Sequence, residues 1–587
     1  MGARRGMNFL GFDVTGLDAG AWTATLQALL PLASLAFLAL VLVRRSPRLL
    51  LCGVLLANAW VFFATTWPLQ RLYALGPSKD RVNNLGLCQV VAAGNPAWET
   101  SLPGQLHFEP FWGLLMAALS GFDPARLERL YVFMPLLTVL AYVLALDFGW
   151  RRPPAETRPG DAWERALVAG CATLLCASAL DWLWRYRVSW ALTFLLKPNH
   201  ALGLVLLPVV LRAVARARGL ASLLAAGFLL HVMGWAFVIH MGLTAVGLVV
   251  FALFSWLDGH AERRRDLRDV AVVLATNLAI VSPYLYMLAV GYVILAARDS
   301  AVVPAASAHL LEVTARAGWL FVLAAWGARR LWLRGDRLSR LWSAQILGAF
   351  LTWAACLALS HVRLARELDE FYYWARFVTA IGAGVGAWDL AQRLWARHER
   401  RLATLRLPSW ARTDPRPVIA VLLAAALVPA TVPYWWDPLR MDPFYRESLE
   451  PLPDWVARPM RWLRDHSRPG DVVVADRDFA PWVPALAARR VLLSSKLNAP
   501  SDFYRRGAVE RALARGGELE HVRAGWERYG VRYLVATPSL ARNYRVTLDD
   551  LRARSELRLL HLSQDGPQRY VAIFELRPEA WGAGGAS

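Results

Sequence analysis

Charged side chains are scarce in this sequence, and lysine and cysteine are scarcer still. Of its 587 residues, 19% are charged, against about a quarter in typical soluble domains. Hydrophobic residues make up 56%, tryptophan occurs 28 times, and the mean hydropathy is +0.33. Several apolar runs reach about 17 to 20 residues, the length that crosses the hydrocarbon core of a bilayer. The composition excludes an ordinary soluble multidomain protein and predicts a polytopic membrane protein.

The few cysteines carry no recognisable chemistry. There are five, none of them in the C-terminal third of the chain or in a CxxC pair. The sequence therefore predicts neither a disulfide framework nor a metal centre. The first long apolar run begins near Leu26 and ends in Arg44 and Arg45 without a small-residue cleavage site, so we expect no cleavable signal peptide.

The net charge of +20 comes from arginine, because only three of the 65 basic residues are lysines. In a soluble protein this charge would suggest a nucleic-acid partner. Here the arginines form short clusters between apolar runs, which is the positive-inside pattern of membrane proteins. We therefore expect no nucleic-acid partner and predict that the clusters face the cytoplasm. They lie at 44–48, 151–165, 212–218, 263–268, 329–340 and 393–416.

Twelve crossings place all six clusters on one side of the membrane and both chain ends on the other. The apolar runs predict helices at 24–43, 49–66, 130–148, 164–182, 200–213, 220–238, 241–257, 269–293, 317–333, 341–360, 376–393 and 416–434. The short apolar run Phe111–Leu119 is predicted to be an interfacial or re-entrant helix; if it crosses, the count is 13. Arg4 and Arg5 fit this topology least well, since they would prefer the cytoplasm.

After residue 434 the pattern changes to alternating strands and helices. Strands are predicted at 471–476, 490–495, 531–537 and 569–576, with helices at 504–516 and 519–529. The expected fold class is an all-α polytopic membrane protein of about 12–13 transmembrane helices with a C-terminal α/β extracytoplasmic domain. The predicted domains are a membrane domain, 1–434, with a large outward loop, 67–129; an α/β domain, 435–578; and a flexible tail, 579–587.

The large outward loop contains the first candidate site residues. Asp80 follows a membrane exit by about a dozen residues, so it is expected near the headgroup plane, where a carboxylate can act as a general base. Alternatively, Asp80 pairs with Lys79 or Arg81 in a solvated loop. Further along, His107 and Glu109 precede the short apolar helix.

The second outward loop combines an acid with cations. It contains Asp181 and then Lys197, Asn199 and His200 at the mouth of a helix. Two of the three lysines lie in the outward loops of the membrane part, and a lysine is a compact charge suited to phosphate. A lysine that simply snorkels at a helix end is the alternative.

Three further candidates lie at later helix ends. His240 lies in an apolar helix, where a histidine is costly unless it faces a cavity or a partner; a hydrogen-bonded core histidine is the alternative. Tyr373 suits the membrane interface, and Arg376 follows where a lipid phosphate could reach. A charged interfacial loop without further function is the alternative for these two.

In their order along the chain, these segments resemble a known family. They are VAAGNPAW (91–98), HFEPFWGLLMAAL (107–119), KPNHALGL (197–204), FVIHMGLTAV (237–246) and EFYYWARFVTAIGAGVG (370–386), followed by an outward α/β domain. The layout resembles the polytopic glycosyltransferases of the C-type superfold, which include protein mannosyltransferases and aminoarabinose transferases. It looks most like their bacterial relatives, which implies a bacterial cytoplasmic (inner) membrane location.

The resemblance implies an inverting membrane glycosyltransferase with a polyprenyl-phosphate-linked sugar donor. It would act at the outer face of the membrane on a glycan, lipid or protein acceptor, among membrane lipids. Asp80 matches the first-loop acid of the family, with Glu109 and Asp181 as further catalytic candidates. Lys197, His200 and Arg376 would bind the donor phosphate. The substrate cavity would contain four more residues: His107, Asn199, His240 and Tyr373.

The sequence also departs from the family pattern. Asn199-His200 stands where many relatives have a second acid, and Asp80-Arg81 where some have two adjacent acids. No cofactor is therefore expected, and a divalent metal is an option that no motif supports. Two alternatives remain: a non-catalytic envelope assembly protein of the same fold, or a transporter or flippase of lipid-linked substrates, although no inverted repeat is present.

Overall fold

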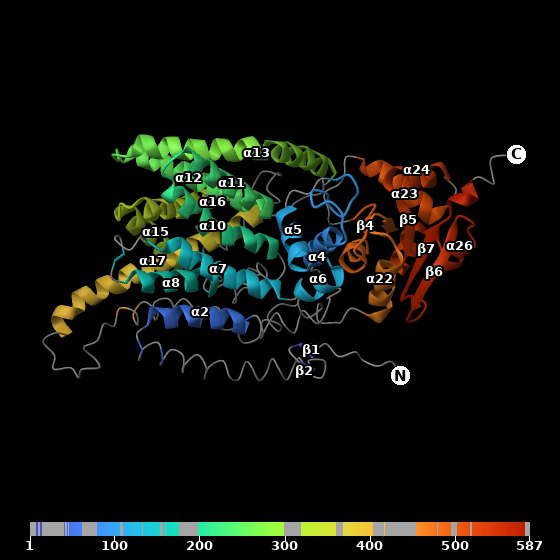
Figure 1. Ribbon diagram of the computed structural model, residues 1–587, viewed down its shortest axis with the longest axis horizontal. Coiled ribbons are helices and arrows are strands. Elements are labelled where there is room, and N and C mark those ends of the chain that lie inside the picture. Colours follow the sequence, from blue (N-terminus) through green and yellow to red (C-terminus); the bar gives the residue numbers. More distant parts are fainter. Residues whose placement is uncertain are drawn as a thin grey trace.

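The computed structural model of the chain shows a helical bundle followed by a small sheet (Figure 1). It describes residues 8–9, 12–13, 40, 44, 46–61, 79–105, 110–131, 133–152, 157–158, 160–174, 198–298, 318–359, 368–402, 416, 419, 453–477, 479–494, 502–516 and 519–581. At several positions, Asp80, Asn199, Tyr373 and Arg376 among them, only the backbone is described. The predicted order, a helical part and then an α/β part, is confirmed.

Apolar runs became the helices of the bundle. Its described helices are α2 (Pro47–Val61), α7 (Met134–Trp150), α8 (Asp161–Leu174), α10 (Pro198–Arg216), α11 (Leu220–Ala236), α12 (Val238–Leu257), α13 (Arg263–Arg298), α15 (Gly318–Leu333), α16 (Arg337–Leu359) and α17 (Leu368–Leu402). Each overlaps the run that predicted it. The runs predicted at 24–43 and 416–434 lie almost entirely outside the described residues.

The length and hydropathy of the helices bear on the predicted crossings. Among the described residues, α12 is long and apolar enough to cross a membrane by itself. Helix α6 (Pro124–Tyr131) and α7 pass the same test as one bent pair, with an angle of 63° between them. The remaining apolar helices among the described residues, such as α11, are too short to pass this test for a membrane span. The total of 12 or 13 crossings therefore stays a prediction.

Glycine allows two of the bundle helices to approach closely. An added Cβ at Gly386 of α17 would lie 2.2 Å from the Leu323 carbonyl oxygen of α15, and one at Gly327 of α15 would lie 2.0 Å from the Gly382 carbonyl oxygen of α17. At Gly382 an added Cβ would be in tight contact with Ala324, at 3.0 Å. Lipid tails are as apolar as the side chains, so helices in a bilayer associate mainly through close van der Waals packing. Small residues four positions apart permit this close approach. The AIGAGVG segment thus fixes α17 against α15.

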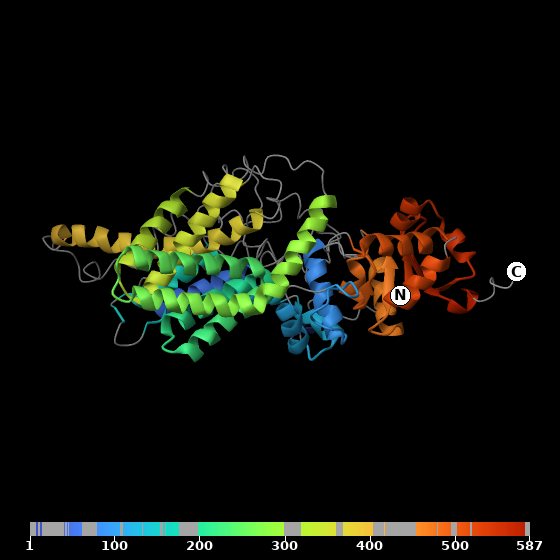
Figure 2. The ribbon, with the colours of Figure 1, turned by 90° about the horizontal axis from the view of Figure 1, so that it is seen from above.

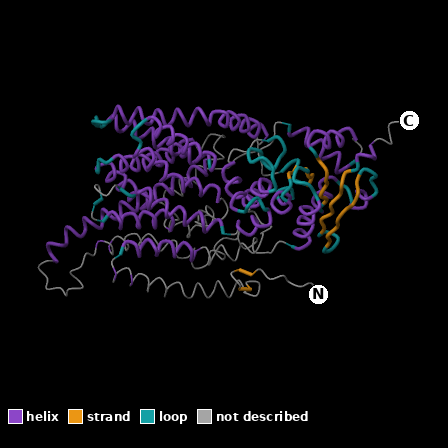
Figure 3. Tube along the Cα trace, viewed as in Figure 1, coloured by secondary structure: helices purple, strands orange, loops and turns teal. Residues whose placement is uncertain are grey.

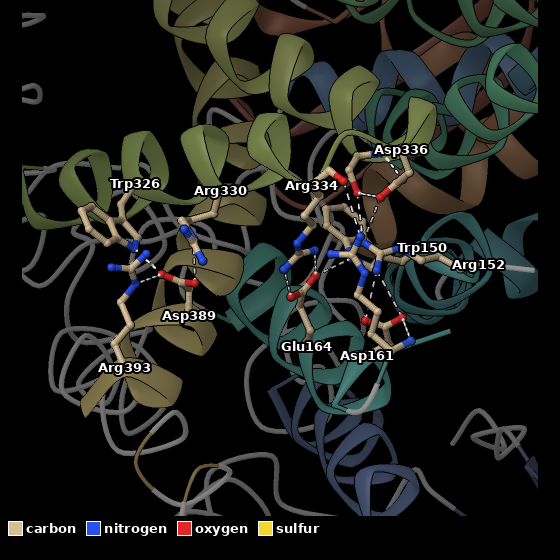
Figure 4. Close-up of polar contacts among 12 residues, drawn as sticks. Trp150, Arg152, Asp161, Glu164, Trp326, Arg330, Arg334, Asp336, Asp389 and Arg393 are labelled. Carbon is tan, nitrogen blue, oxygen red and sulfur yellow. Dashed lines mark hydrogen bonds and ion pairs between the residues drawn. The ribbon is translucent and has the colours of Figure 1, made fainter. Parts of the chain in front are cut away.

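Buried ion pairs join the helices at one end of the bundle (Figure 4). Arg334 pairs with Glu164 of α8, which also accepts a hydrogen bond from Trp150 Nε1 at 3.0 Å. Arg152 lies between Asp161 and Asp336, at 3.3 and 3.5 Å. A second group joins α15 to α17 through Asp389, which accepts from Arg330, Arg393 and Trp326. These carboxylates neutralise part of the predicted basic clusters.

Three short helices occupy the segment predicted to be a large outward loop. They are α4 (Lys79–Ala92), α5 (Pro110–Leu119) and α6. Helix α5 confirms the short helix expected at 111–119, and its ten residues are too few to cross a bilayer. Helices α4 and α6 were not predicted; the polar residues that open α4, KDRVNN, obscure its helical periodicity.

The C-terminal part is a mixed five-stranded sheet with the order β4-β3-β5-β7-β6 (Figure 3). Strands β3 (Val472–Ala475), β4 (Arg490–Val491) and β5 (Val531–Ala536) are parallel, whereas β7 (Tyr570–Leu576) and β6 (Leu557–Gln564) are antiparallel to their neighbours. Helices α23 (Phe503–Arg515) and α24 (Leu519–Tyr529) confirm the two predicted helices.

Several elements of this part were not predicted. They are strand β6, the helices α22 (Asp454–His466), α25 (Pro538–Tyr544) and α26 (Leu548–Arg552), and the π-helical turn η7 (Val483–Ala487). Near the N-terminus, a hairpin of two two-residue strands, β1 (Asn8–Phe9) and β2 (Phe12–Asp13), was not predicted either. A 3₁₀ turn, η8 (Pro578–Trp581), occupies the first residues of the predicted flexible tail.

The C-terminal domain shares its hydrophobic core with α4–α6. Val82 and Leu85 of α4 and Trp112 of α5 belong to the same buried cluster as Val473 and Ile573 of the sheet. Figures 1 and 2 both show α4–α6 between the bundle and the sheet. The segment that carries α4–α6 and the C-terminal domain therefore form one packed unit, although more than 300 residues of chain separate them.

Candidate functional site

His200 and His240, the predicted site residues whose side chains are described, lie at the end of the bundle that faces α4–α6. Helix α10 begins there at Pro198, and α11 turns into α12 at Phe237, a single extended residue with φ −163° and ψ 112°. Proline suits the first position of a helix because its missing N–H would have no partner there. Leu202 of α10 packs against the core shared by α4–α6 and the sheet.

Two predicted histidines meet at this end through one phenylalanine. The His200 ring stacks on Phe237 with ring centroids 3.6 Å apart, and His240 contacts the same ring edge-on at 5.3 Å. Both histidines are buried. An added Cβ at Gly203, one turn beyond His200, would lie 2.6 Å from His240 Cδ2. The start of α10 is thus locked to the α11–α12 turn by two histidines, a phenylalanine and a glycine.

Asp80 lies in the first turn of α4. By its backbone, position 80 therefore lies at the N-terminal end of α4, the end at which the helix dipole is positive. The rest of α4 is held in place by the C-terminal domain: a Cβ added at Gly86 would lie 3.0 Å from Pro484 of η7. The helix that carries Asp80 is therefore fixed by packing along its length.

Tyr373 and Arg376 lie three residues apart near the start of α17 and hence on one face of that helix. Thirteen residues separate Arg376 from Asp389, which pairs with Arg330 near the C-terminal end of α15. At 1.5 Å per residue this spacing places Arg376 about 20 Å from the ion-paired end. Arg376 thus lies toward the same end of the bundle as the start of α10.

The remaining candidates lie outside the described residues. These are His107, Glu109, Asp181 and Lys197; for Asp80, Asn199, Tyr373 and Arg376 the position on a helix is known and the side chain is not described. Among the described residues, no group of three His, Cys, Asp or Glu side chains is arranged to hold a metal ion.

A polar cluster in the C-terminal domain escaped the sequence reasoning. Asp476 follows β3 and Thr537 follows β5, and the Thr537 hydroxyl donates to Asp476 Oδ2 at 2.6 Å. Glu510 of α23 accepts a hydrogen bond of 2.7 Å from the Tyr544 hydroxyl. Burial raises the pKa of Glu510 and that of Tyr544. The signal was present in the sequence, because polar residues directly after parallel strands meet at one edge of a sheet.

Structural comparisons support the fold expected from the sequence. The chain is similar to ArnT from Cupriavidus metallidurans in the apo state, with 14% sequence identity, a TM-score of 0.50, and coverage of 89% of this chain and 97% of ArnT. No protein-family model and no curated protein sequence matches the chain.

Lower similarity is found to two structures of an oligosaccharyltransferase from Archaeoglobus fulgidus. One is the apo form (13% identity, TM-score 0.48), and the other is AglB with an inhibitory peptide and a dolichol-phosphate (12%, 0.45). Each covers 84% of this chain and 69% of the archaeal one. We base the fold on ArnT alone. ArnT has the fold of the C-type glycosyltransferases, so the family resemblance seen in the sequence is confirmed for the fold.

Proposed function

We propose that this protein is a membrane glycosyltransferase that transfers a sugar from a polyprenyl-phosphate-linked donor to an acceptor at the outer face of the membrane. The observation that carries the proposal is the likeness to ArnT, which extends over 97% of that enzyme and over both the bundle and the C-terminal part of this chain. A fold alone does not define a reaction, so the residues at the bundle end supply the second argument.

The start of α10 is the proposed site for the donor phosphate. The first N–H groups of a helix have no partners within it and favour an anion. Lys197 directly precedes this helix, and Arg376 lies toward the same end on α17. His200 is buried against Phe237, so its part is to hold the start of α10 in position behind the phosphate. Asn199, His240 and Tyr373 would line the adjoining substrate cavity.

The proposed reaction is an in-line displacement at the anomeric carbon. The acceptor hydroxyl attacks that carbon and gives its proton to the Asp80 carboxylate, while the bond to the phosphate oxygen breaks with inversion. Polyprenyl phosphate leaves with the bonding electron pair, and the cations near α10 neutralise its charge. Glu109 and Asp181 are the next candidates for the base, and His107 precedes Glu109 at the entrance to α5.

The C-terminal domain is proposed to position the acceptor. It shares a core with α4, the helix that carries Asp80, so movement of the domain would carry the proposed base with it. The described strands contain no nucleophile with an adjacent base and orienting acid. We therefore assign the domain to acceptor binding and the bundle end to donor binding, with the chemistry between them.

The test is to incubate the purified full-length protein with a panel of polyprenyl-phosphate sugars and to measure release of polyprenyl phosphate. A donor-dependent release that needs Asp80 supports the proposal. An envelope assembly protein of the same fold would release none and would be indifferent to Asp80→Asn. A flippase would move the donor across a vesicle membrane without cleaving it.

A further inference from the structure

A large basic cavity lies at the opposite end of the bundle. It has a volume of about 1130 Å³ and is formed by the C-terminal end of α10 and by the α7–α8, α12–α13 and α15–α16 connections. Figure 1 shows these connections at the end away from the C-terminal domain. Eight arginines and three carboxylates line the cavity, which leaves an excess of five positive charges.

One wall of the cavity consists of arginines without acidic partners. In the described part of the chain, Arg212, Arg216 and Arg218 of the α10 end form no ion pair with a carboxylate. Arg212 is held in place all the same: it donates to the Arg151 carbonyl at 3.0 Å and lies over the Phe148 ring at 4.2 Å. This differs from the neighbouring network of Figure 4, where each of the four labelled arginines has a carboxylate partner.

The opposite wall contains buried donors without acceptors. Arg337 uses Nε and Nη2 for Asp266 and Asp269, at 3.2 and 2.7 Å. Its Nη1, like Nε and Nη1 of Arg340, is buried and has no acceptor among the described atoms. The two side chains are only 14% and 12% exposed. Burying a cation whose N–H groups lack acceptors is costly, and an anionic charge bound nearby lowers this cost.

We propose that this cavity binds the phosphate group of an anionic lipid headgroup. Guanidinium groups bind phosphate oxygens through paired, charge-assisted hydrogen bonds, and arginines face the cavity from both walls. A phosphodiester in this cavity would supply a counter-charge for Arg216 and Arg218 and for Arg337 and Arg340, which line the same cavity. The site lies at the far end of the bundle from His200 and is independent of the proposed glycosyl transfer.

Apolar side chains beside the cavity favour a lipid over a free phosphate. Leu220 and Leu257 are 63% and 70% exposed, and each lies within three residues of a residue that lines the cavity. Exposed leucines next to a basic pocket suit a headgroup whose acyl chains lie along the helices. Basic pockets between membrane helices at the cytoplasmic face are typical sites for anionic headgroups, and the positive-inside pattern predicts this face for the cavity.

The experiment measures binding to the full-length protein in neutral detergent. The ligands are phosphatidylglycerol, phosphatidylcholine and inorganic pyrophosphate, which separate an anionic lipid, a zwitterionic lipid and a free phosphate compound. The variants are R216Q/R218Q, which breaks no described ion pair, and R337Q/R340Q. The matched control is R264Q/R397Q, which removes two exposed arginines that do not line the cavity.

Phosphatidylglycerol is expected to bind more tightly than phosphatidylcholine and to bind about tenfold more weakly to each cavity variant, with little change in the control. A different result would be that pyrophosphate binding is weakened by the same variants while phosphatidylglycerol and phosphatidylcholine bind equally. That result would support a phosphate site and assign it to a soluble ligand. Equal affinity of wild type and both folded cavity variants for every ligand would overturn the proposal. R216Q/R218Q leaves the described ion pairs intact and is therefore expected to fold. If R337Q/R340Q does not fold, unchanged lipid and pyrophosphate affinities of R216Q/R218Q alone overturn the proposal.

Discussion

Arg490 Nη1 donates to Glu99 Oε2 at 2.9 Å and so joins strand β4 of the C-terminal sheet to the segment that follows α4. Beside this pair, the Val491 N–H donates to the Ser101 carbonyl at 2.8 Å, and the outer edge of β4 is thereby covered. Arg506 reaches the Pro103 carbonyl from α23. The segment 99–103 is therefore part of the C-terminal unit in structure, although it precedes most of the bundle in sequence.

Breaking the Arg490–Glu99 pair should loosen this unit. Both side chains are mostly buried, at 18% and 23% exposed, so Arg490→Gln is expected to lower the free energy of unfolding by about 1 to 2 kcal/mol. Thermal unfolding of the full-length protein in detergent measures the change, and a double-mutant cycle with Glu99→Gln isolates the pair. The matched control is Arg523→Gln, which breaks an exposed pair within α24 and should change little. Additive effects of the two substitutions would show that the pair contributes nothing.

The contact between Gly203 and His240 predicts a steric effect at the proposed donor site. An alanine Cβ at position 203 would lie 2.6 Å from His240 Cδ2, so Gly203→Ala must displace the imidazole or separate α10 from α12. We expect a loss of about 1 to 3 kcal/mol in stability, together with weaker donor binding. Gly242→Ala is the control, because nothing lies within 4 Å of its added Cβ. Equal behaviour of the two variants would contradict the close packing at Gly203.

Glu510 predicts a pH dependence in the C-terminal domain. Burial raises the pKa of this carboxyl above its ordinary value of 4.5. The folded state therefore keeps the proton longer than the unfolded state, and the resulting stabilisation is present at low pH and lost as the pH rises through the raised pKa. Thermal unfolding at a series of pH values from 4.5 upward should show this loss in the wild type and not in Glu510→Gln. Glu520→Gln, an exposed position on α24, should retain it.

Hydrophobicity was sufficient to locate the described bundle helices because each of them contains an apolar run. Helix α12 and strand β5 were found within a few residues of their observed bounds. Helix α4 was missed because it begins with KDRVNN and gains its burial from Pro484 and its neighbours, far away in sequence. Strand β6 was missed because it is an edge strand with mostly half-buried residues, so its alternation is weak.

The candidate site could be predicted only in part. The sequence identified His200 and His240 separately, but not that Phe237 joins them, because the stacking of His200 on Phe237 depends on how α10 packs against the α11–α12 turn. The arginine clusters were interpreted only as a topology signal. Which arginines have carboxylate partners, such as Arg334, and which have none, such as Arg216, depends on how the helix ends meet.

The two outward cations should act mainly on the donor. Lys197→Ala and Arg376→Ala are each expected to weaken binding of the polyprenyl-phosphate sugar, and to lower turnover less, because the charges hold the phosphate both before and during the reaction. Steady-state kinetics with varied donor separates the two effects. A change confined to acceptor affinity would place these residues elsewhere in the site.

Asp80→Asn should abolish transfer. Asparagine keeps the size and much of the hydrogen bonding of aspartate but cannot accept a proton at neutral pH, so loss of the base should lower the rate by about 100-fold to 10,000-fold. Asp123→Asn is the matched control within the same segment: its carboxylate accepts the Ala125 N–H at 2.8 Å at the start of α6, a capping role that asparagine fills equally well. Release of polyprenyl phosphate by folded, membrane-inserted variants is the measurement. If Asp80→Asn retained activity as Asp123→Asn does, the base would lie elsewhere, and Glu109 and Asp181 would be the next positions to substitute.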